Sequence, residues 1–161
     1  MLIYFIVLAW LLHRAGYENS EALFYAEKVK LLFEADENTL LTIGTTYPTI
    51  TFLTAVIFTP FGYPFAPVLA SIVFTTILFF TVISDFSKSA LPRRVFIPMI
   101  FLLFVFHPGI LFAATSGRGV AAIMLFFYLV FRSFIQVLSN ANNVLSINGK
   151  YLFNLLSVLR L

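Results

Sequence analysis

The chain has 161 residues, of which 61% are hydrophobic and only 11% are charged. Soluble domains carry about 25% charged residues, so a water-soluble fold of this composition could not cover its surface with polar groups. The net charge of +3 gives no nucleic-acid footprint, and the absence of cysteine excludes disulfides and thiolate metal sites.

Long apolar runs predict transmembrane helices. Backbone groups in hydrocarbon need hydrogen-bond partners, so a spanning segment is either a helix or part of a closed barrel. Barrel strands alternate apolar and polar residues, whereas these runs are apolar on every side. The expected fold class is all-α: a polytopic transmembrane bundle of four or five helices, forming a single membrane domain over residues 1–161. The expected location is a membrane, crossed several times, and specifically the bacterial inner membrane.

The first two segments are short or charged. Residues 1–14 form an apolar run that ends at His13 and Arg14, too short for the roughly 20 residues of a span, so they predict a partial first helix. Residues 18–37 predict an amphipathic helix on the bilayer surface, capped by Asn19 or Ser20. Its apolar face is expected to contain Ala22, Tyr25, Ala26, Val29, Leu32 and Phe33.

Residues 47–135 predict three or four transmembrane helices. A short helix with Pro48 in its first turn runs to about Thr59, and a tight turn at residues 60–64 follows. A clear uncharged span at 65–83 is followed by a polar loop at 85–94. A second span at 95–114 is interrupted at 107–109, and a loop at 115–119 leads into a helix from 120 to about 131. The chain then continues with a polar loop at 139–150 and a partial last helix at 151–161.

The basic residues give a first indication of orientation. Counted along alternating loops, one side of the membrane receives Arg14, Lys28, Lys30, Lys88, Arg93, Arg94, Arg132 and Lys150, and the opposite side receives Arg118. The positive-inside rule then places the acidic segment at residues 18–37 in the cytoplasm. This count requires both short helices to cross the membrane.

Glu18 and Glu21 are the first candidates for chemistry. Carboxylates at a membrane surface can hold a divalent cation or act as a general base on a lipid-linked substrate. The alternative interpretation is the solvated face of an interfacial helix, which needs no ligand.

His107 and Arg118 are the other two candidates. A histidine within a membrane segment suggests a proton relay or a ligand to a metal or pigment, although His107 could instead satisfy backbone groups freed by Pro108. The only other histidine is the distant His13, so no metal site is expected. Arg118, between two glycines, could bind a phosphate or anchor a helix end to lipid headgroups.

Five strings follow one another along the chain: residues 18–26, Thr46-Tyr47-Pro48-Thr49-Ile50, Phe61-Gly62-Tyr63-Pro64, His107-Pro108-Gly109-Ile110-Leu111-Phe112 and the small-residue stretch 113–119. In this order they resemble the N-terminal part of GT-C glycosyltransferases, polytopic membrane enzymes that use polyprenyl-phosphate sugars. The resemblance implies that Glu18 or Glu21 acts as base on the acceptor, or binds a divalent cation as in the metal-dependent members.

The chain departs from this pattern in three respects. It is far shorter than family members, Arg118 stands where a second acidic residue is often expected, and the family keeps its acidic loop outside the cell. We therefore expect a truncated module that acts on lipid-linked sugars; the alternative is a non-catalytic small subunit of a larger membrane complex. Expected partners are membrane lipid, a polyprenyl-phosphate sugar and other membrane subunits, but not nucleic acid.

Overall fold

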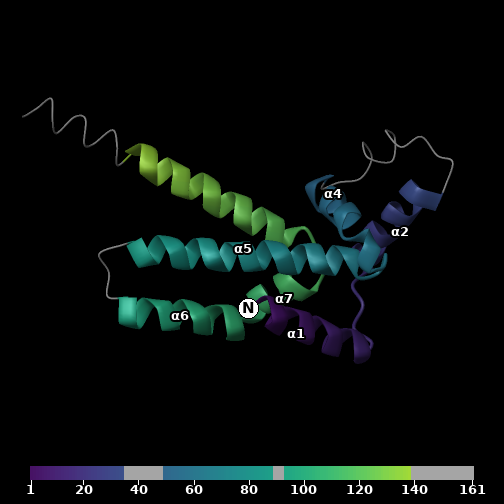
Figure 1. The fold of residues 1–161 in the computed structure, drawn as a ribbon, viewed down its shortest axis with the longest axis horizontal. Coiled ribbons are helices and arrows are strands. Elements are labelled where there is room, and N and C mark those ends of the chain that lie inside the picture. Colours follow the sequence, from purple (N-terminus) through teal and green to yellow (C-terminus); the bar gives the residue numbers. More distant parts are fainter. Residues whose placement is uncertain (35–48, 89–92, 139–161) are drawn as a thin grey trace, which may run out of the picture. The chain divides into compact units, whose positions relative to one another are not determined.

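The computed structural model describes residues 1–34, 49–88 and 93–138, and all regular structure within these ranges is helical (Figure 1). The predicted all-α class is therefore confirmed for the described part of the chain. The chain divides into two compact units, Met1–Leu125 and Phe126–Leu161. The ends and turns expected at residues 35–37, 44–48, 139–150 and 151–161 lie outside the described residues.

Fewer spans are present in the described ranges than the four or five expected. Two helices, Ala66–Ser87 and Val120–Leu138, are long and apolar enough to cross a membrane, with mean hydropathies of 2.3 and 2.0. A bent pair, Arg94–Phe106 with Pro108–Thr115, makes three if it counts as one span. These helices support a membrane protein.

Helix α5 (Ala66–Lys88) is the element against which the other helices of the first unit pack. The span predicted at residues 65–83 is confirmed, but the helix continues into the expected polar loop, because residues 84–88 contain neither proline nor glycine. The hydroxyls of Thr75 and Thr76 donate to the carbonyls four residues earlier, at 2.9 and 2.8 Å. These internal bonds satisfy polar groups inside an apolar helix.

The predicted interruption at His107 is confirmed as a break between α6 (Arg93–Phe106) and α7 (Pro108–Thr115). His107 is extended, with φ −73° and ψ 117°, and the two helix axes differ by 60°. Pro108 has no N–H to continue the helix, so the backbone of α6 loses a donor at this position. A break of this kind resembles the discontinuous helices found where backbone groups must find new partners inside a membrane.

Helix α1 (Leu2–Arg14) lies end to end with α6 along α5 (Figure 1). Near its start, the Tyr4 hydroxyl donates to the Val105 carbonyl oxygen at 2.8 Å, beside the break. Near its end, the His13 ring packs edge-on against Phe65, with 4.9 Å between the centroids. Because α1 runs only from the break to the beginning of α5, it follows about half of the length of α5.

This placement corrects the count of positive charges. Arg14 ends α1 beside the beginning of α5, and Arg118 lies there too, because its carbonyl oxygen accepts a hydrogen bond from Ser71. Lys88 and Arg93 lie at the opposite end, where α5 ends and α6 begins. The sequence-based count grouped Arg14 with Lys88 and Arg93, because it assumed that the short helix ending near Thr59 crosses the membrane between them; the helix described there, Thr49–Ile57, has only nine residues.

Helix α2 (Ser20–Glu34) buries its apolar face in protein. Four residues of the predicted apolar face, Ala22, Tyr25, Ala26 and Val29, are buried, whereas Phe33 is 57% exposed. The face packs on α5 and on the nine-residue α4 (Thr49–Ile57), in a core formed by Tyr25, Val29, Phe52, Ala55 and Ala66. This apolar face is therefore covered by α4 and α5, whereas the sequence analysis had assigned it to the bilayer surface.

The Tyr4–Val105 hydrogen bond gives the first prediction. Tyr4→Phe leaves a carbonyl beside the helix break without this donor, and should lower the free energy of unfolding in detergent micelles by about 1 kcal/mol. Tyr17→Phe is the control, because Tyr17 has no hydrogen bond of this kind in the described structure and is 44% exposed. Equal stability of the Tyr4 variant and the unmodified chain would contradict a role for this bond.

Candidate functional site

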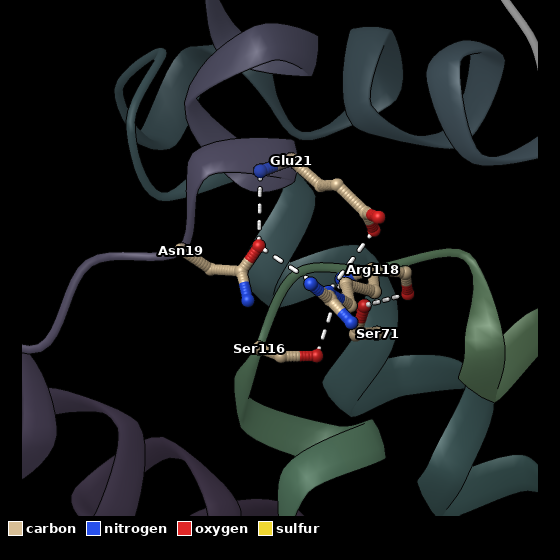
Figure 2. A network of polar contacts seen from close by, with 5 residues as sticks. All are labelled: Asn19, Glu21, Ser71, Ser116 and Arg118. Carbon is tan, nitrogen blue, oxygen red and sulfur yellow. Dashed lines mark hydrogen bonds and ion pairs between the residues drawn. The ribbon is translucent and has the colours of Figure 1, made fainter.

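The loop that follows α7 brings Arg118 to the beginning of α2 (Figure 2). Gly117 makes this approach possible, since it has φ +69°. A Cβ atom at Gly117 would lie 2.7 Å from the Cβ of Ala22 and 3.2 Å from Cγ2 of Val68. Only glycine combines this backbone conformation with so little space, and so the loop sits tightly between α2 and α5.

Arg118 joins three segments of the chain. Its carbonyl oxygen accepts a hydrogen bond from Ser71 Oγ of α5 at 3.0 Å, and its backbone N–H donates to Ser116 Oγ at 3.4 Å. Its Nε lies 3.1 Å from Glu21 Oε2 and donates to Asn19 Oδ1 at 3.4 Å. The cation predicted to bind a phosphate or a headgroup is thus paired with a carboxylate of its own chain.

Asn19 serves two partners with one oxygen. Its Oδ1 accepts a hydrogen bond from the backbone N–H of Glu21 at 2.9 Å, which confirms Asn19 as the cap of α2. The same Oδ1 accepts the weaker bond from Arg118. The first turn of α2 and the loop after α7 are therefore linked through this side chain, as Figure 2 shows.

Glu18 has a different environment from Glu21, although both were predicted as catalytic candidates. Glu18 Oε1 lies 3.7 Å from Nδ1 of His13, and the two side chains are 53% and 43% exposed. His13 is charged only when it is protonated, whereas the guanidinium beside Glu21 is always charged. The structure thus gives Glu21 a permanent cationic partner and Glu18 a titratable one.

A cavity of about 210 Å³ lies beside Glu18, between α1 and α5. Apolar side chains form most of its wall, including Ile6 and Trp10 of α1 and Ile72 of α5. Its polar lining comes from His13, Tyr17, Glu18, Asn19, Thr115 and Ser116. An apolar cavity of about 150 Å³ is large enough for benzene, so this one can take part of a hydrocarbon group.

The combination of apolar wall and polar groups suits an amphipathic ligand. Glu18 and Asn19 line the cavity, whereas Glu21 and Arg118 do not. Of these predicted site residues, Glu18 would therefore contact a bound ligand, whereas Glu21 and Arg118 hold the neighbouring segments together.

His107 is not brought to this site. It caps α7 at the helix break, is exposed, and makes no hydrogen bond from its side chain to the helix end. Its ring lies over Gly109, where an added Cβ would meet Cε1 at 3.1 Å. It is absent from the cavity lining, and the structure gives no support to joint chemistry with Glu18.

No group of three or more histidine, aspartate or glutamate side chains that could hold a metal ion occurs among residues 1–34, 49–88 and 93–138. The carboxylates of Glu18 and Glu21 have His13 and Arg118 as neighbours, and each of these neighbours is a cation or can become one. We therefore assign no residue to the divalent cation that the resemblance to metal-dependent enzymes allows.

Sequence reasoning missed two participants, His13 and Ser71. His13 was read only as the end of the first apolar run, and Ser71 is a single hydroxyl within a long apolar span. A polar residue in an apolar helix is a usable signal, but Thr75 and Thr76 give the same signal and bond only to their own helix. Nothing in the sequence distinguishes Ser71 from them.

These features define a helical membrane protein with an amphipathic cavity at one end of its main span. No protein-family model matches the chain, and no curated protein or solved structure matches it either. The function must therefore be argued from the residues that surround the cavity.

The tight packing at Gly117 gives the second prediction. Gly117→Ala should lower the free energy of unfolding by about 2 kcal/mol or more, because it combines a left-handed backbone with a steric clash. Gly16→Ala is a matched control: Gly16 has φ +80° but no atom within 4 Å of an added Cβ, so it loses only the backbone contribution of about 1 kcal/mol. Denaturant unfolding in micelles measures both, and equal losses would contradict close packing of the loop.

Proposed function

We propose that the chain is a multi-pass membrane protein that holds a lipid-linked sugar and acts as a GT-C-like glycosyl-transfer module. The observation that carries this proposal is the position of Glu18, whose carboxylate lines the polar part of an otherwise apolar cavity. A lipid-linked substrate has this same division, with a hydrocarbon chain and a polar head. The order of motifs that resembles the GT-C family supports the same function.

In the proposed reaction, Glu18 accepts the proton of an acceptor hydroxyl. The acceptor oxygen then forms a bond to the anomeric carbon of the sugar, and the bond from that carbon to the phosphate oxygen breaks. Polyprenyl phosphate leaves with the electron pair of that bond. Glu21 has a structural role in this scheme, because its carboxylate is paired with Arg118 at 3.1 Å.

The resemblance to the family suggests an orientation in which the acidic segment lies outside the cell. Lys88, Arg93 and Arg94 lie at the end of α5 and the beginning of α6, away from the cavity. The cavity end carries Arg14, Lys28, Lys30 and Arg118 together with Glu18, Glu21, Glu27 and Glu34. Lys and Arg are nearly evenly divided between the two ends, so the positive-inside rule does not decide between them. We follow the resemblance, which keeps the acidic segment outside the cell, and place the connection between α5 and α6 in the cytoplasm and the cavity on the outer side, in a bacterial inner membrane.

This orientation gives the third prediction. The chain contains no cysteine, so single cysteines report their own position. Tyr17→Cys near the cavity should react with a membrane-impermeant maleimide in intact bacterial cells that express the protein, and Val95→Cys near the start of α6 should react only after permeabilisation. Both positions are exposed, at 44% and 62%. The reverse pattern of labelling would contradict the proposed orientation.

The fourth prediction concerns the carboxylates. In vesicles containing a polyprenyl-phosphate sugar and an acceptor, Glu18→Gln should reduce sugar transfer by about 100-fold or more, the typical contribution of a general base. Glu21→Gln should reduce it less, because its effect is indirect, and the exposed Glu27→Gln should leave it unchanged.

Unchanged transfer in Glu18→Gln would remove the catalytic assignment. Absence of any transfer or donor binding by the unmodified chain, together with stable co-purification of other membrane proteins, would favour the alternative, a non-catalytic small subunit of a larger complex.

A further inference from the structure

Two separate segments form the polar part of the cavity. Asn19, just before α2, and Ser116, just after α7, both line it. They are far apart in the sequence, and neither lies within the long helix α5. The cavity keeps its present wall only while these two segments stay together.

Arg118 makes the polar contacts that join them. Its backbone N–H donates to Ser116 Oγ at 3.4 Å, while its Nε reaches Asn19 Oδ1 and Glu21 Oε2 across the boundary between the segments. The backbone contacts to Ser71 and Ser116 do not depend on the side chain of Arg118, so the loop would keep them in a variant. The contacts to Asn19 and Glu21 require the guanidinium, as Figure 2 shows.

The strength of this link is limited. The side chains of Arg118 and Glu21 are 35% and 53% exposed, and ion pairs of that exposure are weak and are screened by salt. The Arg118 guanidinium also lies 5.3 Å from the centroid of the Phe112 ring, which keeps it near the loop when Glu21 is released. Such a contact can therefore open and close repeatedly without unfolding the helices.

We propose that Arg118 is a positioning residue that holds Asn19 and the neighbouring Glu18 beside the cavity and restricts the entry of water-borne molecules. Release of Glu21 from Arg118 frees the beginning of α2 and opens the polar end of the cavity. This inference depends on the cavity and its wall, and it does not depend on the sugar-transfer reaction. It also replaces the expectation that Arg118 binds a phosphate or a headgroup directly.

The test uses a cysteine inside the cavity. Ile72 lines the cavity and is 1% exposed, and the chain has no cysteine of its own, so Ile72→Cys reports access to the interior. The measured quantity is the rate of its modification by a small water-soluble maleimide in lipid nanodiscs. In this background, Arg118→Gln should raise the rate about fivefold, the change expected when an exposed ion pair is lost.

Three further measurements separate positioning from a general loosening of the fold. The exchanged pair, Glu21→Arg with Arg118→Glu, should return the rate to within about twofold of the background, because the ion pair is restored with reversed polarity. Lys30→Gln, which removes the 3.5 Å pair with Glu34 on the same helix, should not change the rate. High salt should raise the rate in the background but not in Arg118→Gln.

An unchanged rate in Arg118→Gln would overturn the proposal. An increase that the exchanged pair does not reverse, or that Lys30→Gln reproduces, would show that the helices have loosened generally and would overturn it as well. Because none of these rates involves a sugar, loss of transfer activity in the Glu18 experiment and failure of this proposal are independent results.

Discussion

Helix α5 must satisfy its polar groups without water, and the first unit is organised by how it does so. Thr75 and Thr76 return their hydroxyls to carbonyls of their own helix, whereas Ser71 donates to the carbonyl of Arg118. This bond fixes the loop after α7 at the beginning of α5. Gly117 then lets the loop pack against Ala22 of α2, and the Arg118 side chain meets the start of that helix. The position of the polar network follows from these short-range constraints.

The same constraints distinguish two carboxylates that are close in the sequence. Glu21 is paired with a permanent cation, and Glu18 lies beside His13 at an apolar cavity. A cavity walled by α1 and α5 and lined at one end by polar groups favours a ligand with a hydrocarbon part and a polar part. The proposal of a lipid-linked sugar rests on this cavity and on the order of the sequence motifs, and the proposed transfer step rests on the position of Glu18.

The sequence predicted features that depend on local chemistry. Composition indicated membrane helices, Pro108 indicated the break at His107, and Asn19 was one of two caps proposed for α2. Features that depend on distant partners were not predictable. Glu18 and Glu21 look equivalent in the sequence, and what distinguishes them in the structure is the ion pair between Glu21 and the distant Arg118. The course of α1 also escaped prediction, because its 13 apolar or basic residues do not reveal whether it crosses a membrane or stops beside a break.

The central claim is that the cavity between α1 and α5 receives the hydrocarbon part of a lipid-linked substrate. The most direct measurement is photocrosslinking of the protein in nanodiscs with a polyprenyl-phosphate sugar that carries a photoreactive group on its hydrocarbon chain, followed by mapping of the modified residues. The account predicts modification of cavity residues such as Ile6, Trp10 and Ile72, suppressed by an excess of unlabelled donor. Modification confined to exposed apolar residues outside the cavity, such as Met99 and Leu102, or insensitive to competition, would contradict it.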